Sequence, residues 1–265
     1  MLKRMVVLSM AVGLLVSGVA FGAEAKVEVR GVRIVGEGYG GKRNTELRPF
    51  NWSEGTQVVL LLQAPGGGLL DFDEDASKLE TFADDKGTDL LKAEKDARFG
   101  RKPGFGHFNK VSKDGKASMV TLESTRLPAA GASELKLAGK LVFRSATTKK
   151  TYEQKGVALK AETAIDFEQV PMKVQKVGKP KWGNDPLAVT LETTADPMCI
   201  AELKFVGADG KEIKSRMRSR MHSGNTFRHT YNLKKKADKV TIEIDYWTDM
   251  KKVEVPFSVA ATLGL

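Results

Sequence analysis

The sequence predicts an all-β protein with two antiparallel β-sandwich domains, immunoglobulin-like or fibronectin-like, after a cleaved signal peptide. Three observations predict this fold class: short segments of alternating apolar and polar residues recur along the chain, Asp-Gly turns separate several of them, and helical periodicity is almost absent. About 240 residues remain after the signal peptide, which suits two domains of about 100 to 120 residues. We expect a signal peptide at 1–25, an N-terminal sandwich at 26–162 and a C-terminal sandwich at 163–265.

The first residues have the three parts of an export signal. Lys3 and Arg4 give a basic start, residues 6–21 are almost wholly apolar, and Ala23-Glu24-Ala25 offers a small-residue cleavage site. The alternative is a short membrane anchor, but an apolar run of this length barely spans about 30 Å of hydrocarbon. No later segment approaches the roughly 20 apolar residues of a membrane span. We therefore expect an exported protein, periplasmic or extracellular, with no transmembrane segment in the mature chain.

The first half of the chain reads as strands and turns. Residues 26–35 alternate in polarity, and residues 56–64 form a continuous apolar run that suits a central strand covered on both faces. Asp114-Gly115 predicts a tight hairpin into a strand at 117–124. A long strand follows at 134–145 and a modest one at 151–160, both assigned to the N-terminal domain.

An acidic stretch at 71–96 contains a weak calcium candidate. Asp71, Asp73 and Asp75 alternate as the oxygen ligands of a calcium loop do, but Ala76 replaces the turn glycine and Phe82 stands in place of the bidentate glutamate. The simpler interpretation is a solvated loop followed by a hairpin around residues 84–87, with a short helix capped by Ser77 as the alternative. We therefore expect no metal and no cofactor.

The second half repeats the strand pattern. We expect strands at 165–177, 187–191, 200–206 and 239–247, and a last one through Val253, Val255 and Phe257 that closes the C-terminal domain. The single cysteine, Cys199, excludes an internal disulfide, so the cores must be held by packing alone.

The most basic stretch lies at 203–233 and ends in a hairpin signal at Gly224-Asn225. If residues 215–222 form a strand, an unbroken basic row occupies one face, and Met217 and Met221 occupy the other. A hairpin loop with an odd number of residues would place both methionines beside Phe227, Tyr231 and Leu233, with His222 pointing outward and His229 inward. A helix is the alternative, because Ile213, Met217 and Met221 are also spaced four residues apart.

Charge suggests a binding role for this stretch. The chain carries a net charge of +10, and the mature chain +9. An excess of this size favours polyanions or anionic surfaces as partners. The candidate polyanion-binding residues are Lys214, Arg216, Arg218, Arg220, His222, Arg228, Lys234, Lys235 and Lys236. Two other interpretations stay open: a solvated face that protects an edge strand from aggregation, and a surface that docks against the acidic stretch at 71–96.

Catalytic motifs are absent from the sequence. It contains no G-x-S-x-G elbow, no H-E-x-x-H, no C-x-x-C pair and no phosphate-binding glycine loop before a helix. We therefore expect a non-catalytic structural or protein-interaction module at the cell envelope, bound to another envelope or extracellular protein. The second hypothesis is polyanion binding, to an acidic polysaccharide, lipid headgroups or nucleic acid. A hydrolase is the third, because carboxylate pairs converge only in the fold.

Overall fold

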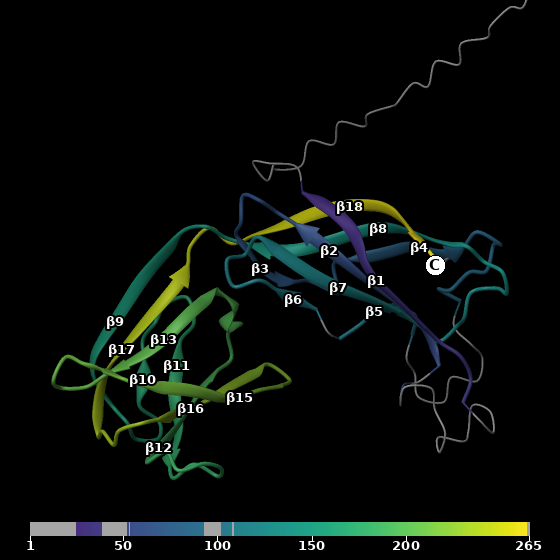
Figure 1. Cartoon of the computed structure of the whole chain (residues 1–265). Coiled ribbons are helices and arrows are strands. Elements are labelled where there is room, and N and C mark those ends of the chain that lie inside the picture. Colours follow the sequence, from purple (N-terminus) through teal and green to yellow (C-terminus); the bar gives the residue numbers. More distant parts are fainter. Residues whose placement is uncertain (1–24, 39–51, 53, 93–101, 108, 264–265) are drawn as a thin grey trace, which may run out of the picture. The chain divides into compact units, whose positions relative to one another are not determined.

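The computed structural model describes residues 25–38, 52, 54–92, 102–107 and 109–263 (Figure 1). The predicted signal peptide lies almost wholly outside these residues. Apart from the short 3₁₀ helix Pro197–Cys199, their regular structure consists of strands, and every strand pair with a defined register is antiparallel. The prediction of an all-β, antiparallel protein is therefore confirmed.

The chain folds into two compact units, and the second is inserted into the first. One unit comprises Met1–Ser145 and Lys252–Leu265, and the other comprises Ala146–Lys251. These limits differ from the predicted ones. The strand at 149–158 pairs inside the second unit, and the last strand of the chain returns to the first. Local sequence patterns locate strands but do not choose their partners, which explains the difference.

Two sheets build the first unit. One has the order β1-β2-β7-β5, with β6 beside β7, and the other has the order β18-β8-β3, with β4 paired to β8. Their bounds are β1 Lys26–Val35, β2 Gly55–Gln63, β3 Leu69–Phe72, β4 Lys78–Asp84, β5 Gly104–Phe105, β6 Lys110–Val111, β7 Ala117–Ser124, β8 Glu134–Ser145 and β18 Lys251–Thr262.

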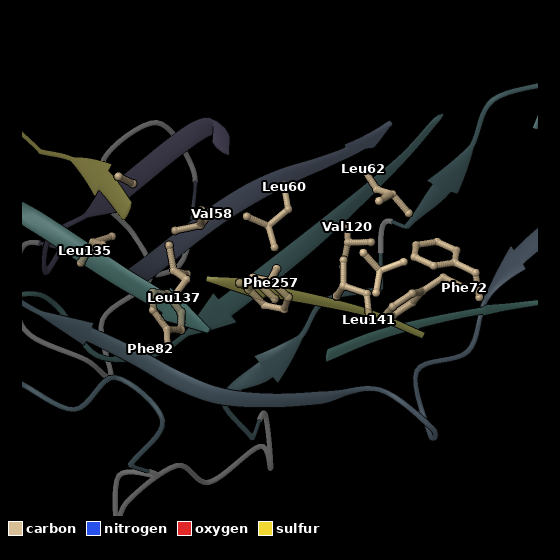
Figure 2. Close-up of a cluster of buried hydrophobic side chains, with 14 of the residues drawn as sticks. Val58, Leu60, Leu62, Phe72, Phe82, Val120, Leu135, Leu137, Leu141 and Phe257 are labelled. Carbon is tan, nitrogen blue, oxygen red and sulfur yellow. The ribbon is translucent and has the colours of Figure 1, made fainter. Parts of the chain in front are cut away.

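Side chains from both sheets of the first unit meet in one hydrophobic cluster (Figure 2). Leu60 and Leu62 of β2 are fully buried there, together with Phe82 of β4. Phe257 of β18 belongs to the same cluster, so the last strand completes this core. β2 lies between β1 and β7, so its predicted central position is confirmed. Its alternate residues Val59 and Leu61 are only half-buried, so the predicted full cover on both faces was wrong.

The second unit also has two sheets. One has the order β10-β11-β12-β16-β15 and the other β14-β13-β17-β9, and one cluster takes its buried residues from both. Phe205 and Tyr231, from opposite sheets, meet edge to face with ring centroids 5.5 Å apart. The bounds are β9 Lys149–Ala158, β10 Ala164–Ile165, β11 Met172–Gly178, β12 Leu187–Thr193, β13 Ile200–Val206, β14 Glu212–Ile213, β15 Ser215–Ser223, β16 Thr226–Leu233 and β17 Lys239–Trp247.

Asp249 joins the two ends of the second unit. Its Oδ1 accepts hydrogen bonds from the backbone N–H groups of Thr147 (3.0 Å) and Thr148 (2.9 Å), and its Oδ2 accepts from both threonine hydroxyls. These donors stabilise the charged carboxylate and lower the pKa of Asp249 to about 2. The entering and leaving segments are therefore held side by side.

The β15–β16 hairpin differs from its predicted register. Its loop has two residues, Gly224 (φ 58°) and Asn225, because Ser223 pairs with Thr226. Glycine first in a two-residue loop is typical of a type II′ turn. A β-bulge then shifts the pairing between Met217 and Ser219. The odd-loop prediction was therefore wrong.

The bulge separates the two methionines. Met217 lies opposite Tyr231 and packs against the core, as predicted. Met221 lies on the other face with 55% of its surface exposed, so its predicted burial was wrong. His222 pairs with Phe227 and Arg220 with His229, which places His222 and His229 on the same face rather than on opposite ones.

Candidate binding groove on the second unit

The groove lies on the face of the sheet β11-β12-β16-β15 that points away from the core. Figure 1 labels these four strands. Val189 and Tyr231 point from this sheet into the core, so their neighbours Thr190 and Thr230 point away from it. Lys176, Thr190, Thr230 and Ser219 pair in turn and form one row across four strands. The hydroxyl groups of Thr190 and Thr230 are hydrogen-bonded at 3.0 Å.

Small side chains keep the floor of the groove low. In the next row Gly178 pairs with Ala188, and Ala188 pairs with Asn232. Together with the hydroxyl row, these residues leave space above the sheet. The floor therefore combines small apolar residues with the hydroxyl groups of Thr190, Thr230 and Ser219.

The loop between β11 and β12 forms one wall. It presents Trp182 with 85% of its surface exposed. Gly183 has a φ of +88°, a conformation that glycine adopts readily. A Cβ atom at this position would lie 3.5 Å from Nη2 of Arg218. The loop therefore lies against the guanidinium group of Arg218, the extra residue of the β15 bulge.

Asp185 anchors the end of this loop. Its buried carboxylate accepts hydrogen bonds from Nζ of Lys234 (2.7 Å) and Nδ2 of Asn232 (3.2 Å), and Nη2 of Arg218 lies 3.7 Å away. The hydrogen bonds from Lys234 and Asn232 lower the pKa of Asp185 below its ordinary value, so it is charged at neutral pH. Two cations and one amide thus hold the loop on β15 and β16.

At the other end of the groove, Arg228 is paired. Its Nε lies 2.6 Å from Oε2 of Glu192, and Nζ of Lys173 lies 3.7 Å from Oε1 of the same residue. The hydrogen bond from Arg228 lowers the pKa of Glu192. Met221 pairs with Arg228 across the strands and adds an apolar surface there.

The groove has a volume of about 780 Å³ and an uneven charge. Its described lining includes five cationic residues and no acidic one. Lysines 176, 179 and 181 form no ion pair with the described part of the chain. The full lining is Gln175, Lys176, Gly178, Lys179, Pro180, Lys181, Trp182, Gly183, Ala188, Thr190, Arg218, Ser219, Met221, Arg228, Thr230 and Asn232.

The structure brings only some of the predicted polyanion-binding residues to this groove. Arg218 and Arg228 line it, and Lys234 lies behind it on Asp185. Arg216 lies opposite Asn232 on the same face but does not line the groove.

The other predicted residues lie elsewhere. Arg220 is on the opposite face and its Nε lies 2.9 Å from Sδ of Met217, while His222 stacks on Phe227 with ring centroids 4.2 Å apart. Lysines 214, 235 and 236 are exposed outside the strands, and Nζ of Lys235 lies 3.3 Å from Oδ2 of Asp209. The predicted unbroken basic row therefore changes face at the bulge.

Asp73, the central residue of the calcium candidate, lies beside two cationic side chains of the protein. Asp73 is buried, and its Oδ2 lies 2.9 Å from Nζ of Lys252 and 4.0 Å from Nε of Arg144. Asp71 belongs to β3, and Asp75 to the turn between β3 and β4. The described residues contain no cluster of three His, Cys, Asp or Glu residues suited to a metal ion. β4 is a strand, so the alternative of a helix after Ser77 was wrong.

Sequence reasoning missed Trp182 and the hydroxyl row. A tryptophan inside a polar, proline-bounded loop is a usable signal, because no local apolar pattern would bury it. The threonines offered no such signal, because Thr190 and Thr230 are 40 residues apart and meet only through the pairing of β12 with β16.

No family model, curated protein or solved structure matches this chain. In the residues that the structure describes, no helix is both long and apolar enough to cross a bilayer.

Proposed function

We propose that this chain is an exported, non-catalytic binding protein of the cell envelope whose second unit holds an anionic polymer in the Trp182 groove. The observation that carries this proposal is the lining itself: an exposed aromatic ring, neutral hydrogen-bonding groups and cations without a single acid among its described residues. The other proposed roles of an exported protein of this kind are a structural role and an interaction with an envelope or extracellular protein.

We further propose that each unit is a β-sandwich and that the second is immunoglobulin-like. In an immunoglobulin domain one sheet has the order A-B-E-D and the other contains C-F-G. The order β11-β12-β16-β15 supports the first assignment, and β14-β13-β17-β9 supports C′-C-F-G for the second. The strand in the place of G is β9, which precedes A in the chain. This arrangement resembles a circular permutation, which domains with adjacent termini tolerate.

Binding fits the groove better than catalysis. General acid–base chemistry and nucleophilic attack ordinarily use a carboxylate, an imidazole, a desolvated lysine amine or an activated thiol or hydroxyl group. The lysines of the groove, Lys176, Lys179 and Lys181, are exposed rather than desolvated. The described lining contains no Asp, Glu, His or Cys, and its threonine hydroxyls bond to each other rather than to a base. The acidic residues near the groove, Asp185 and Glu192, are engaged in holding the loop and the sheet. This composition supports a ligand site rather than a hydrolase.

A polyanion column tests the proposal. We expect the mature protein to bind immobilised dextran sulfate and a K176E/K179E/K181E variant to elute at clearly lower salt, because each phosphate-like or sulfate contact contributes to the salt dependence of binding. The matched control is K214E/R216E/K236E, which makes the same change of charge outside the groove.

The two variants separate the candidate surfaces. If only the groove variant loses retention, the groove binds the polymer. An equal loss of retention in both variants would indicate unspecific attraction of the polymer to net charge. A loss of retention in the control alone would indicate that the polymer binds at Lys214, Arg216 and Lys236 instead. Failure of the unmodified protein to bind the column would overturn the proposal outright.

A further inference from the structure

The ligand of the groove must hydrogen-bond to side chains rather than to the backbone. The floor is formed by β12 and β16, which are interior strands with partners on both sides. Their backbone N–H and C=O groups already serve the sheet, so a peptide cannot add to it as an extra strand. The groups that remain are the hydroxyl of Ser219, the amide of Gln175 and the free hydrogen-bonding capacity of the Thr190–Thr230 hydroxyl pair. Such neutral groups match a ligand rich in hydroxyls.

Trp182 supplies a flat apolar surface beside these groups. With 85% of its surface exposed, it leaves a large aromatic face in water. Covering such a face contributes about 1.5–3 kcal/mol for a large apolar side chain. A sugar ring has one apolar C–H face and a rim of hydroxyls, so it can stack on the indole and reach the polar floor together. Aromatic side chains that combine an apolar body with a polar tip suit this kind of interface.

The unpaired charge of the groove comes from lysines. Arg218 and Arg228 have acidic partners in Asp185 and Glu192. Lysines 176, 179 and 181 have none in the described part of the chain and line the same groove as the exposed ring. An anionic group on the ligand would compensate this charge. A neutral sugar would leave it uncompensated.

Nucleic acid fits less well, although it is also a polyanion. Proteins that bind single strands without sequence preference stack successive bases on several aromatic side chains. The described lining offers one aromatic ring, Trp182, and its other apolar residues are Pro180, Met221 and Ala188. One stacked ring and several hydroxyl partners suit a short segment of polysaccharide better.

From the hydrogen-bonding floor, the exposed Trp182 and the unpaired lysines we infer that the groove binds an acidic oligosaccharide. One sugar ring stacks on Trp182, and the carboxylate or sulfate groups of the oligosaccharide lie near Lys176, Lys179 and Lys181. This inference rests on the proposed function and specifies its ligand. Arg218 and Asp185 act as positioning residues, because they hold the loop that carries Trp182.

Calorimetric titration of the mature protein tests the inference with four probes: a trigalacturonate, a sulfated oligosaccharide, a neutral galactose trimer and a single-stranded oligonucleotide of similar charge. We expect at least one acidic sugar to bind more tightly than the neutral trimer. W182A should weaken that binding roughly tenfold or more, and W182F by less. W247F is the control, since Trp247 lies on β17 in the other sheet, against Lys149. Trp182 is exposed, so its variants should keep the wild-type melting temperature.

Three results would overturn the inference. In the first, neither acidic sugar binds. In the second, the wild type and W182A bind an acidic sugar equally tightly. In the third, the oligonucleotide binds more tightly than the acidic sugars and its binding depends on Trp182. If the lysine variant lost retention on dextran sulfate while W182A bound acidic sugars normally, the proposed function would stand and the sugar-stacking inference would fail. If W182A lost sugar binding but the lysine variant kept its retention, the site would bind sugar without the proposed role in polyanion binding.

Discussion

The side chains in and behind the groove are held in place by hydrogen bonds and ion pairs to one another. Thr190 and Thr230 hydrogen-bond to each other, and Asp185 gathers Lys234, Asn232 and Arg218 at the base of the loop. A buried carboxylate with partners of this kind is far less costly than an unpaired one. The side chain of Asp185 therefore stabilises the wall of the groove, although it does not line the groove.

His229 should make the stability of the second unit depend on pH. Burial, followed by the nearby charge of Arg220, lowers the pKa of His229 below its ordinary 6.5. A lowered pKa means that the unfolded chain takes up the proton first as the pH falls. The stabilising contribution is therefore complete above about pH 6.5 and is lost as the pH falls toward the lower folded-state pKa.

Thermal unfolding between pH 7.5 and 5 measures this effect. We expect the melting temperature of the wild type to fall more steeply with acidification than that of H229Q, by on the order of a few degrees. H222Q is the control, because His222 stacks on Phe227 in an exposed position. Identical slopes for wild type and H229Q would contradict the assignment.

At the scale of the elements, β15 is an edge strand with a built-in irregularity. Among the described strands it pairs with β16 alone, and its bulge at Arg218 interrupts the ladder. Bulges and charges on edge strands prevent pairing with other chains. The interpretation that the basic row is a solvated face that protects an edge strand from aggregation thus stays a prediction. It applies to the part of the row that lies outside the groove.

Deleting Arg218 tests the bulge as a protection against aggregation. Met217 pairs with Tyr231 and Ser219 with Thr230, which are adjacent in β16, so the deletion leaves a regular ladder. We expect an unfolding free energy within about 1 kcal/mol of the R218S control but increased self-association by light scattering. R218S keeps the bulge and removes the same charge. Equal scattering by both variants would contradict a protective role.

At the scale of the whole molecule, the inserted unit separates β18 from the rest of its own core. Val255, Phe257 and Ala261 are buried in the first unit, although more than 100 residues separate them from β8. Lys252 at the start of β18 also pairs with the buried Asp73 of the first unit. The first unit therefore cannot complete its core until the second has been synthesised.

Ending the chain after Lys251 should unfold the first unit and spare the second. The burial of Val255 and Phe257 alone contributes roughly 3–6 kcal/mol of stabilising free energy. This is a large share of the usual unfolding free energy of a domain, about 5–15 kcal/mol. We expect limited proteolysis with mass spectrometry to degrade the first unit and leave a resistant fragment near residues 146–251.

Point variants in the intact chain provide the control for this truncation. V255S/F257S should reproduce the proteolysis pattern, whereas E254Q/S258A, on the exposed face of the same strand, should not. Preferential degradation of the second unit would contradict the assignment of β18 to the first core.

The sequence by itself determined the all-β class, the position of most strands and several turns. β8 has the bounds expected for it, and the Asp114-Gly115 turn joins β6 to β7 as predicted. These features are local, because a period of two residues and the conformational freedom of glycine act within a few positions. Trp182 was missed, although a large apolar residue in a polar loop could have drawn attention to it.

Only the tertiary structure decided which strands are partners, where the bulge falls and which side chains form the groove. The return of β18 to the first unit and the row through Thr190, Thr230 and Ser219 depend on pairing between distant segments. One extra residue at Arg218 was enough to divide the basic row between two faces. Because neighbouring side chains alternate between the faces of a sheet, a shift of one residue reverses every later position and leaves no mark in the local sequence.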